Sequence, residues 1–432
     1  MGQTLSEPVT TKESSVCQSK LYNVASCAMQ GWRISMEDSH TQLLSCPDDE
    51  KAAFFAVYDG HGGARVAQFA GMHLHKRVVG NEDFAKGDIA SAIRNGFLKI
   101  DEDLRNDEET KEQMSGTTAV TVLIKDGKIY CGNAGDSRAV LCEQGKAIPL
   151  SFDHKPTNDE ETQRIVAAGG WVEAGRVNGN LALSRALGDF IFKTGEHIKP
   201  EEQVVTAYPD VVEVELTRDH EFIVLACDGV WDVLTNEQVV WFVRNRLASG
   251  VTPDKICEEL LNRCLAPDCE MTGVGCDNMT VVLVCLLQGD TPEEYLERVK
   301  RKSIVDEHEF GELYQKPPGG SMPNSEAELL KSIQQQITMQ LIGRMDDYGL
   351  DDAGDSHSHE SDDIQEIDDE DTDKKEEKSE EEEKKSKEDF VTPSQSPESV
   401  EDKSSAQTLG DDAPPSEFMV PAAAIKDDTK KE

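Results

Sequence analysis

Three aspartates stand at the ends of apolar segments and could together hold a metal ion. Asp59 and Asp228 each follow a short apolar run, which predicts a buried strand that ends in a carboxylate. Asp277 instead precedes an apolar run, Met279 to Leu287. If that third strand lies antiparallel to the other two, all three carboxylates meet at one edge of the core. Oxygen ligands without a His or Cys partner favour Mg²⁺ or Mn²⁺, and a cation would relieve their mutual repulsion.

The elements that must position these carboxylates alternate between strand-like and helix-like segments from Tyr22 to about Leu287. Four closely spaced strands leave no room for helical crossovers and predict an antiparallel meander over 122–124, 128–132, 137–141 and 146–150. Helices are expected to begin after the capping residues Asn158, Thr235, Thr252 and Thr291. The sequence therefore predicts an α+β domain in which helices cover the sheets.

Composition divides the 432-residue chain into four regions. The polar first residues predict a flexible arm over 1–21, and the alternating segments predict a folded domain over 22–288. A helical extension is expected over 289–345. The composition then changes abruptly to Asp, Glu, Ser and Lys, so residues 346–432 are expected to form an acidic disordered tail that cannot bury enough apolar surface to fold.

The charge and the cysteine content argue against several classes of protein. A formal net charge of −41 disfavours nucleic-acid binding, because phosphate contacts need patches of Lys and Arg. No apolar run approaches the roughly 20 residues of a membrane span, and no secretory signal segment is evident. The 11 cysteines are odd in number and several lie in apolar strands, which favours buried reduced thiols over a disulfide framework. These features predict a cytoplasmic protein, with the nucleus as a second location.

Seven short motifs occur in order along the folded domain, and each contains an acidic, basic or hydroxyl side chain. They are Met29–Asp38, Tyr58–Gly63, Ser115–Ala119, Gly132–Arg138, Leu183–Asp189, Cys227–Asp232 and Asp277–Thr280. A single Asp after an apolar strand is usually only a turn residue, but chance does not account for seven ordered motifs. Together they resemble the metal-dependent serine/threonine protein phosphatases of the type-2C family, most of all the eukaryotic alpha/beta-type members.

The resemblance implies two antiparallel β-sheets packed face to face and flanked by helices, a four-layer α/β/β/α sandwich. The region 22–288 would then be the phosphatase catalytic domain. Two Mg²⁺ or Mn²⁺ ions would lie at one sheet edge, where Asp59 would bridge both ions. The carbonyl group of Gly60 would bind one of the ions, and Asp228 with Asp277 would hold the other.

Four further carboxylates have implied roles around these ions. Glu37 and Asp38 would reach them through water molecules. Asp136 and Asp232 match the positions that hold a weaker third ion in some members of the family. The family resemblance thus predicts two ions and leaves a third, weaker site open.

The resemblance also implies a hydrolytic mechanism that acts on phosphoprotein substrates. A hydroxide that bridges the two ions would attack phosphoserine or phosphothreonine directly, so Asp59 serves catalysis through the ions it holds. Arg33 would bind the phosphate through its planar guanidinium group, and Arg176, in a flap over 170–203, would be a second substrate contact. His61 would protonate the departing alkoxide.

Two rival functions are open at this point. One is a catalytically silent relative that acts as a scaffold, although such proteins generally lose metal-ligand carboxylates and every expected one is present here. The other is a cysteine-based phosphatase, because Cys27 and Arg33 have the Cys-x5-Arg spacing of that class. The charges of Glu37 and Asp38 disfavour it, since they would repel both a thiolate and a phosphate dianion.

Regions outside the domain carry two further predictions. The first six residues, Met-Gly-Gln-Thr-Leu-Ser, fit the N-myristoylation pattern with Gly2 as the acylated residue. One acyl chain gives only weak binding, on the order of 10⁴ M⁻¹, so we expect reversible membrane contact and a minor peripheral fraction. The acidic tail is expected to bind a regulatory partner, with a merely solvating segment as the alternative.

Overall fold

The computed structural model describes residues 4–110, 114–195, 197–269 and 273–301. All of these residues belong to one compact unit, Met1–Asp347. The predictions for Gly2, for residues 302–345 and for the tail over 346–432 lie outside the described residues. None of the described helices is both long enough and apolar enough to cross a membrane.

A six-stranded antiparallel sheet positions two of the three aspartates. Its strand order is β1-β2-β16-β15-β9-β10. The strands are β1 (Thr4–Gln18), β2 (Tyr22–Arg33), β16 (Met279–Leu286), β15 (His220–Ala226), β9 (Arg138–Glu143) and β10 (Lys146–Pro149). Ala226 of β15 lies opposite Val281 of β16. The antiparallel pairing expected for the third aspartate is confirmed, because Asp228 just after β15 and Asp277 just before β16 reach the same edge.

A five-stranded antiparallel sheet, in the order β14-β8-β7-β4-β3, positions Asp59 at the end of β4. Its strands are β14 (Asp210–Glu215), β8 (Lys128–Ala134), β7 (Ala119–Lys125), β4 (Ala53–Tyr58) and β3 (Ser39–Leu43). Two smaller sheets complete the described strands. They pair β13 (Leu187–Gly188), β6 (Gly116–Thr117) and β5 (Gly60–His61) in one sheet, and β11 (Val172–Glu173) with β12 (Arg176–Val177) in the other.

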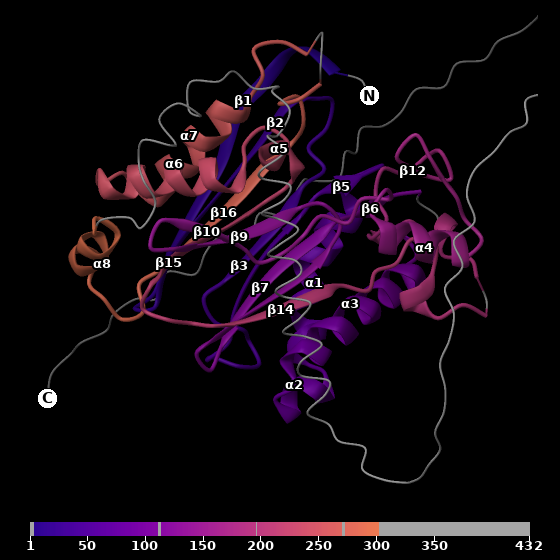
Figure 1. The fold of residues 1–432 in the computed structure, drawn as a ribbon, viewed down its shortest axis with the longest axis horizontal. Helices are drawn as coiled ribbons and strands as arrows, with labels where there is room; N and C mark the ends of the chain where they lie inside the picture. The colour runs from indigo at the N-terminus through magenta and orange to yellow at the C-terminus, as the bar shows by residue number, and fades with distance from the viewer. Residues whose placement is uncertain (1–3, 111–113, 196, 270–272, 302–432) are drawn as a thin grey trace, which may run out of the picture. The chain divides into compact units, whose positions relative to one another are not determined.

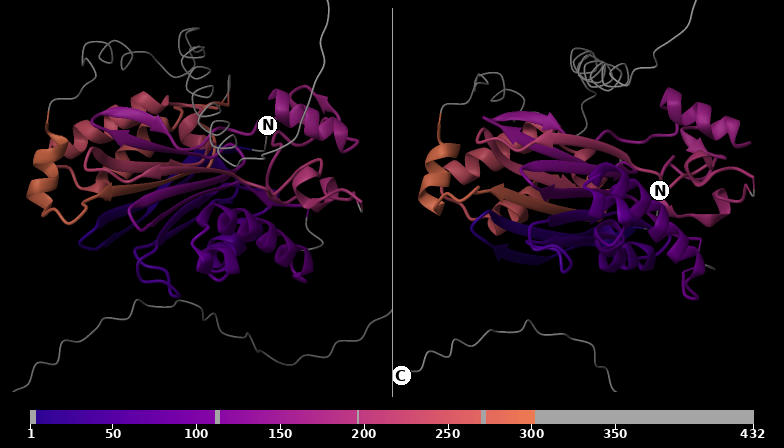
Figure 2. Two further views of the ribbon diagram at one scale, coloured as in Figure 1. Left: turned by 60° about the horizontal axis from the view of Figure 1, so that its bottom comes forward. Right: turned by 90° about the horizontal axis from the view of Figure 1, so that it is seen from below.

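Helices cover the outer face of each large sheet, as Figure 1 and Figure 2 show. The five-stranded sheet packs against α1 (Arg65–Val79), α2 (Glu82–Lys86) and α3 (Ile89–Asn106). The six-stranded sheet packs against α5 (Asp228–Trp231), α6 (Asn236–Ala248), α7 (Pro253–Cys264) and α8 (Pro292–Val299). The remaining elements are α4 (Asp159–Ala167) and two 3₁₀ turns, Phe190–Phe192 and Pro200–Glu202. The four-layer α+β fold predicted from the sequence is confirmed.

Alternate residues of the central strands face two different hydrophobic layers. In β4, Phe54 and Tyr58 pack against the helices, whereas Phe55 and Val57 pack between the sheets. All four side chains are fully buried. Each contributes about 1.5–3 kcal/mol by leaving water, which explains why a strand buried on both faces has a continuous apolar sequence. The same layers hold the strand ends, and with them the aspartates, in place.

Two expectations about the strands were wrong. The arm predicted over 1–21 is not free, because β1 pairs with β2 along most of its length, from Thr4 opposite Arg33 to Gln18 opposite Asn23. The predicted four-stranded meander is two hairpins in different sheets, β7 with β8 and β9 with β10. The chain crosses between the sheets at Gly135, whose φ of +120° suits a residue without a side chain.

The cysteines also differ from expectation at one place. Cys269 and Cys276 form a disulfide, and the pair packs beside Trp32. The other nine cysteines are free, and all but Cys17 are buried. The prediction of buried thiols thus holds for most cysteines, whereas spacing alone did not reveal that the short loop before Asp277 brings two of them together.

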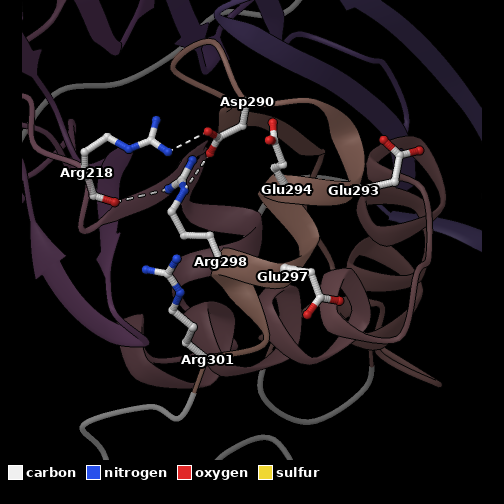
Figure 3. Close-up of a pocket in the computed structure, with 7 residues that line it drawn as sticks. All are labelled: Arg218, Asp290, Glu293, Glu294, Glu297, Arg298 and Arg301. Carbon is white, nitrogen blue, oxygen red and sulfur yellow. Dashed lines mark hydrogen bonds and ion pairs between the residues drawn. The ribbon is translucent and has the colours of Figure 1, made fainter.

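Helix α8, at the start of the predicted extension, packs onto the domain. Arg298 is 5% exposed and donates to Asp290 at 3.0 Å, to the carbonyl oxygen of His220 at 2.8 Å and to that of Leu286 at 2.6 Å. Arg298 and Asp290 line a charged pocket together with Arg218, Arg301 and three glutamates of α8 (Figure 3). The pocket lies where β15 begins and β16 ends, so it is at the opposite end of these strands from the aspartates.

Candidate metal centre

The ends of β4, β15 and β16 bring Asp59, Asp228 and Asp277 into electrostatic contact. Burial raises the pKa of Asp59 well above its usual range, and the charges of Asp228, Asp38 and Asp277 raise it further. Burial also raises the pKa of Asp228, with Asp136 and Asp277 adding to the effect. Buried carboxylates that repel one another need protons or cations to neutralise them. The predicted convergence of the three aspartates is therefore present in the structure.

Asp38 joins the same cluster and offers a free ligand atom. Its Oδ2 accepts from the hydroxyl group of Thr280 at 2.7 Å, whereas its Oδ1 is buried with no hydrogen-bond partner among the described residues. Burial raises the pKa of Asp38 to about 6. Ligand atoms of Asp38, Asp59 and the Cys227 thiol lie within 4.8 Å of one another. An orphaned carboxylate oxygen in a crowded acidic cluster fits a hard divalent cation.

The turn after β4 is held close to Glu37. Gly60 has no room for a side chain, because an added Cβ would collide with the backbone carbonyl oxygen of Glu37. The Glu37 carboxylate accepts from the hydroxyl group of Ser35 at 2.8 Å and from the backbone N–H of Gly63 at 3.2 Å. These contacts place Glu37 against the turn that follows Asp59, whereas the roles of Glu37 and of the Gly60 carbonyl group at an ion stay predictions.

Asn278 fixes the segment that carries Glu37 and Asp38. Its Oδ1 accepts from the backbone N–H of Glu37 at 2.9 Å. Its Nδ2 donates to the carbonyl oxygens of Gln30 at 2.8 Å and Ser35 at 2.9 Å. One buried amide next to Asp277 thus ties the end of β2 to the start of β16, although no ligand role was predicted for it.

The residues predicted for a third ion already have a protein cation as partner. The Lys155 ammonium group forms an ion pair with Asp136, whose side chain is only 7% exposed. Asp232 ends α5 nearby, and burial raises its pKa although Lys155 opposes the shift. A third ion would therefore have to displace Lys155 from Asp136. Nothing in the sequence pattern indicated this pair, because Lys155 lies outside the seven motifs.

The two arginines predicted to contact substrate differ in position. The Arg33 guanidinium group pairs with Asp277 and remains 41% exposed, so it lies at the metal centre and is open to solvent. Arg176 is exposed on the β11–β12 hairpin, where it donates to the carbonyl oxygen of Asn180 at 2.7 Å. Among the described residues, the hydrogen bond of the Arg176 side chain stays within this hairpin and its loop. The structure therefore supports Arg33 as a phosphate contact more directly than Arg176.

His61 lies one residue beyond Gly60 and is paired with a carboxylate. Its Nε2 is 2.7 Å from Oδ2 of Asp189, and the side chains are 28% and 6% exposed. Burial disfavours the charged imidazolium, but the hydrogen bond to Asp189 and the nearby charges of Asp136 and Glu37 outweigh it and raise the pKa of His61. A partly exposed histidine with a raised pKa beside a metal centre can act as a proton donor.

The cysteine-based mechanism is contradicted by the position of Cys27. This residue is in the middle of β2, where its backbone pairs with Ser14 of β1 and Val281 of β16. Burial raises the pKa of the thiol and so disfavours the nucleophilic thiolate. A phosphate-binding loop needs free backbone N–H groups around the cysteine, and a central strand uses them for its neighbours.

Half-buried carboxylates at a sheet edge, beside a partly exposed arginine and histidine, form an arrangement that fits a metal-dependent phosphohydrolase. The family model for protein phosphatase 2C matches residues 22–273, more than half of the chain. The chain therefore belongs to the protein phosphatase 2C family, and it is a protein serine/threonine phosphatase. Enzymes of this family depend in general on Mg²⁺ or Mn²⁺ and act on phosphoproteins, which agrees with the oxygen donors present here.

Individual relatives support this assignment. A probable protein phosphatase 2C of Caenorhabditis elegans is 63% identical over 304 residues, which cover 70% of this chain and 85% of the relative. Protein phosphatase 2C homolog 3 of Schizosaccharomyces pombe is 51% identical over 302 residues, 69% of this chain and 73% of the relative. A serine-threonine phosphatase 2C from Toxoplasma gondii, 21% identical, matches the fold with a TM-score of 0.55 over 66% of this chain and 100% of its own.

Proposed function

We propose that this phosphatase works through two divalent ions held by Asp59, the Gly60 carbonyl group, Asp228 and Asp277. The observation that carries the proposal is the gathering of half-buried carboxylates at one sheet edge, where ligand atoms of Asp38 and Asp59 lie within 4.8 Å of each other and one Asp38 oxygen has no hydrogen-bond partner among the described residues. When bound, Mg²⁺ or Mn²⁺ would supply a nucleophile at neutral pH and stabilise the charge on the phosphate oxygens. A third, weaker ion at Asp136 and Asp232 would compete with Lys155 for the same carboxylate.

The side chains around the ions have separate roles in the proposal. Arg33 binds the substrate phosphate through the part of its guanidinium group that Asp277 does not use. Glu37 and Asp38 orient water molecules at the ions, which agrees with the orphaned Asp38 oxygen. His61 gives a proton to the departing serine or threonine oxygen. Arg176, in the flap over 170–203, makes a second contact with the substrate.

Chelation is expected to stop hydrolysis of a phosphothreonine peptide, whereas Cys27→Ser is expected to keep at least about half of the wild-type kcat. The serine variant removes the only nucleophile of the rival mechanism without adding volume to β2. The measurement is phosphate release with and without excess chelator, followed by addition of Mn²⁺. Activity that survives chelation, or disappears with Cys27, would support the thiol mechanism. A stable, metal-loaded protein without turnover would instead support the scaffold alternative.

We also propose that the acidic tail binds a regulatory partner and takes no part in catalysis. The metal centre is built from residues before 288, and α8 ends at Val299. A protein that ends at residue 345 is therefore expected to hydrolyse p-nitrophenyl phosphate with kcat within about twofold of the full chain. A larger loss would show that the tail supports the domain. If the protein that ends at residue 345 binds the same cellular proteins as the full chain, the tail is only a solvating segment.

We propose that the protein is mainly cytoplasmic and partly nuclear. Acylation of Gly2 would add a minor fraction that binds membranes peripherally. Thr4, two residues after Gly2, pairs with Arg33 at the end of β2 that faces the metal centre. Gly2→Ala should remove the myristoyl mass from the N-terminus and the membrane fraction while sparing kcat. An unmodified wild-type Gly2, or equal partition of both proteins, would exclude the lipid.

A further inference from the structure

We infer that Asp189 is a positioning residue for His61: it holds the imidazole ring through Nε2 and leaves Nδ1 as the nitrogen that meets the substrate. This inference rests on the proposed role of His61 as the proton donor. The pair joins residues 128 positions apart, with 2.7 Å between His61 Nε2 and Asp189 Oδ2. A carboxylate only accepts hydrogen bonds, so Nε2 carries a proton in both the neutral and the charged ring, and the proton that the charged ring gives to the departing oxygen is the one on Nδ1.

The small sheet β13-β6-β5 builds this contact from the backbone. His61 of β5 lies opposite Gly116 of β6, and Gly116 lies opposite Gly188 of β13. Asp189 follows directly after Gly188, and its backbone N–H donates to the carbonyl oxygen of Ser115 at 3.0 Å. Three paired backbones thus fix the distance between the histidine and the carboxylate.

Gly116 leaves the space through which the two side chains meet. A Cβ atom built on it would overlap the Asp189 carboxylate and stand 2.7 Å from His61 Nε2. Real Cβ atoms essentially never approach other atoms so closely, so a side chain here would force the pair apart. The φ angle of Gly116 is not in the left-handed region, which means that close approach, and not backbone conformation, requires the glycine.

A second ion pair, between Lys193 and Asp101, holds the loop that carries Asp189. The buried ammonium group of Lys193 donates to Asp101 Oδ1 and to the carbonyl oxygen of Ala186, both at 2.8 Å. The same Asp101 oxygen accepts from the backbone N–H of Gly188 at 2.7 Å. Asp189 itself has a left-handed φ of +50°, a conformation that Asp tolerates better than most residues with a side chain. The loop is therefore rigid at the point where Asp189 holds the ring.

The test compares two substrates that differ in how much they need a proton donor. We expect Asp189→Ala to lower kcat for a phosphothreonine peptide by on the order of 10- to 100-fold, and kcat for p-nitrophenyl phosphate by less than about threefold, because nitrophenolate leaves without protonation. Asp189→Asn, which retains one acceptor oxygen, should lose less. In ¹⁵N spectra of the full-length protein, His61 should change from the Nε2–H tautomer to a mixture when Asp189 is replaced by Ala.

Non-additivity separates positioning from general destabilisation. The double variant His61→Gln/Asp189→Ala should be no slower on the peptide than His61→Gln alone, because Asp189 acts only through His61. Val243→Ala is the control for general destabilisation: it truncates a buried side chain beneath the six-stranded sheet, away from this loop, so any loss should be equal on both substrates. Equal losses for Asp189→Ala on the two substrates, or losses that multiply in the double variant, would overturn the inference.

One further variant and one further readout keep the test decisive. If Asp189→Ala does not fold, Gly116→Ala separates the same pair by a methyl group and should show the same preference for loss on the peptide. If His61→Gln slows both substrates equally, the proton-donor role of His61 fails. The ¹⁵N tautomer of His61 in the Asp189 variants still reports whether Asp189 holds the ring, so failure of the proposed role and failure of the inference are distinguishable.

Discussion

Asp59→Asn is expected to lower phosphopeptide turnover by at least about 1,000-fold, which corresponds to about 4 kcal/mol of transition-state stabilisation. The carboxylate is proposed to bind both ions, so its loss should empty or distort the whole centre. The stability of the metal-free domain should not fall. Because burial, and then the charges of its neighbours, raise the pKa of Asp59, the ionised group destabilises the metal-free fold, and the amide removes both the desolvation cost and the repulsion.

The measurements are kcat in saturating Mn²⁺ and the melting temperature in excess chelator. Asp103→Asn is a suitable control, because Asp103 pairs with Arg77 on the helical face of the five-stranded sheet and takes no part in the proposed centre. It should keep wild-type turnover. Near-normal turnover of Asp59→Asn in saturating Mn²⁺ would contradict the bridging role. A large fall in its metal-free melting temperature would contradict the electrostatic argument.

Replacing His61 by Gln is expected to slow hydrolysis of phosphoserine and phosphothreonine peptides by about 100-fold, the lower range for loss of a general acid. Hydrolysis of p-nitrophenyl phosphate should change by less than about threefold. The difference arises because an alkoxide is a strong base that needs a proton when it departs, whereas nitrophenolate does not. Glutamine retains a polar side chain of similar length, so the fold should persist.

The steady-state measurement is kcat and KM for both substrates at one Mn²⁺ concentration. His73→Gln is the control, because His73 stacks on Phe69 of the outer helix α1. It should leave both substrates unaffected. Equal losses for His61→Gln on the two substrates would assign the residue to metal binding or substrate binding and reject it as the proton donor.

The sequence predicted the parts of the site that follow from strand direction. An apolar run followed by Asp places a carboxylate at a strand end, and β15 and β16 are antiparallel neighbours, so Asp228 and Asp277 meet. Asp59 was predicted by the same reasoning, although β4 lies in the other sheet. This step did not depend on the sheet order, because the two sheets pack face to face and their strand ends share an edge.

Other features depend on long-range contacts that no local pattern reveals. Asp189 was part of a recognised motif, yet only the register of three very short strands brings it to His61. Lys155 reaches Asp136 through the turn that separates the two sheets. The N-terminal residues were too polar to predict a strand, but β2 offered a free edge with which β1 could pair. In each case tertiary pairing decided the outcome against local composition.

The most direct test of the metal-centre proposal measures bound metal and turnover on the same samples. Chelator-treated enzyme is titrated with Mn²⁺, and bound ions and phosphopeptide hydrolysis are recorded together for the wild type and for Asp59→Asn. We predict that Asp59→Asn binds fewer Mn²⁺ ions than the wild type. Wild-type turnover should rise from zero in proportion to the occupancy of the Mn²⁺ sites that are missing in the variant. Full turnover before any Mn²⁺ is bound, or identical Mn²⁺ binding by the two proteins, would contradict the assignment of the carboxylate cluster as the metal centre.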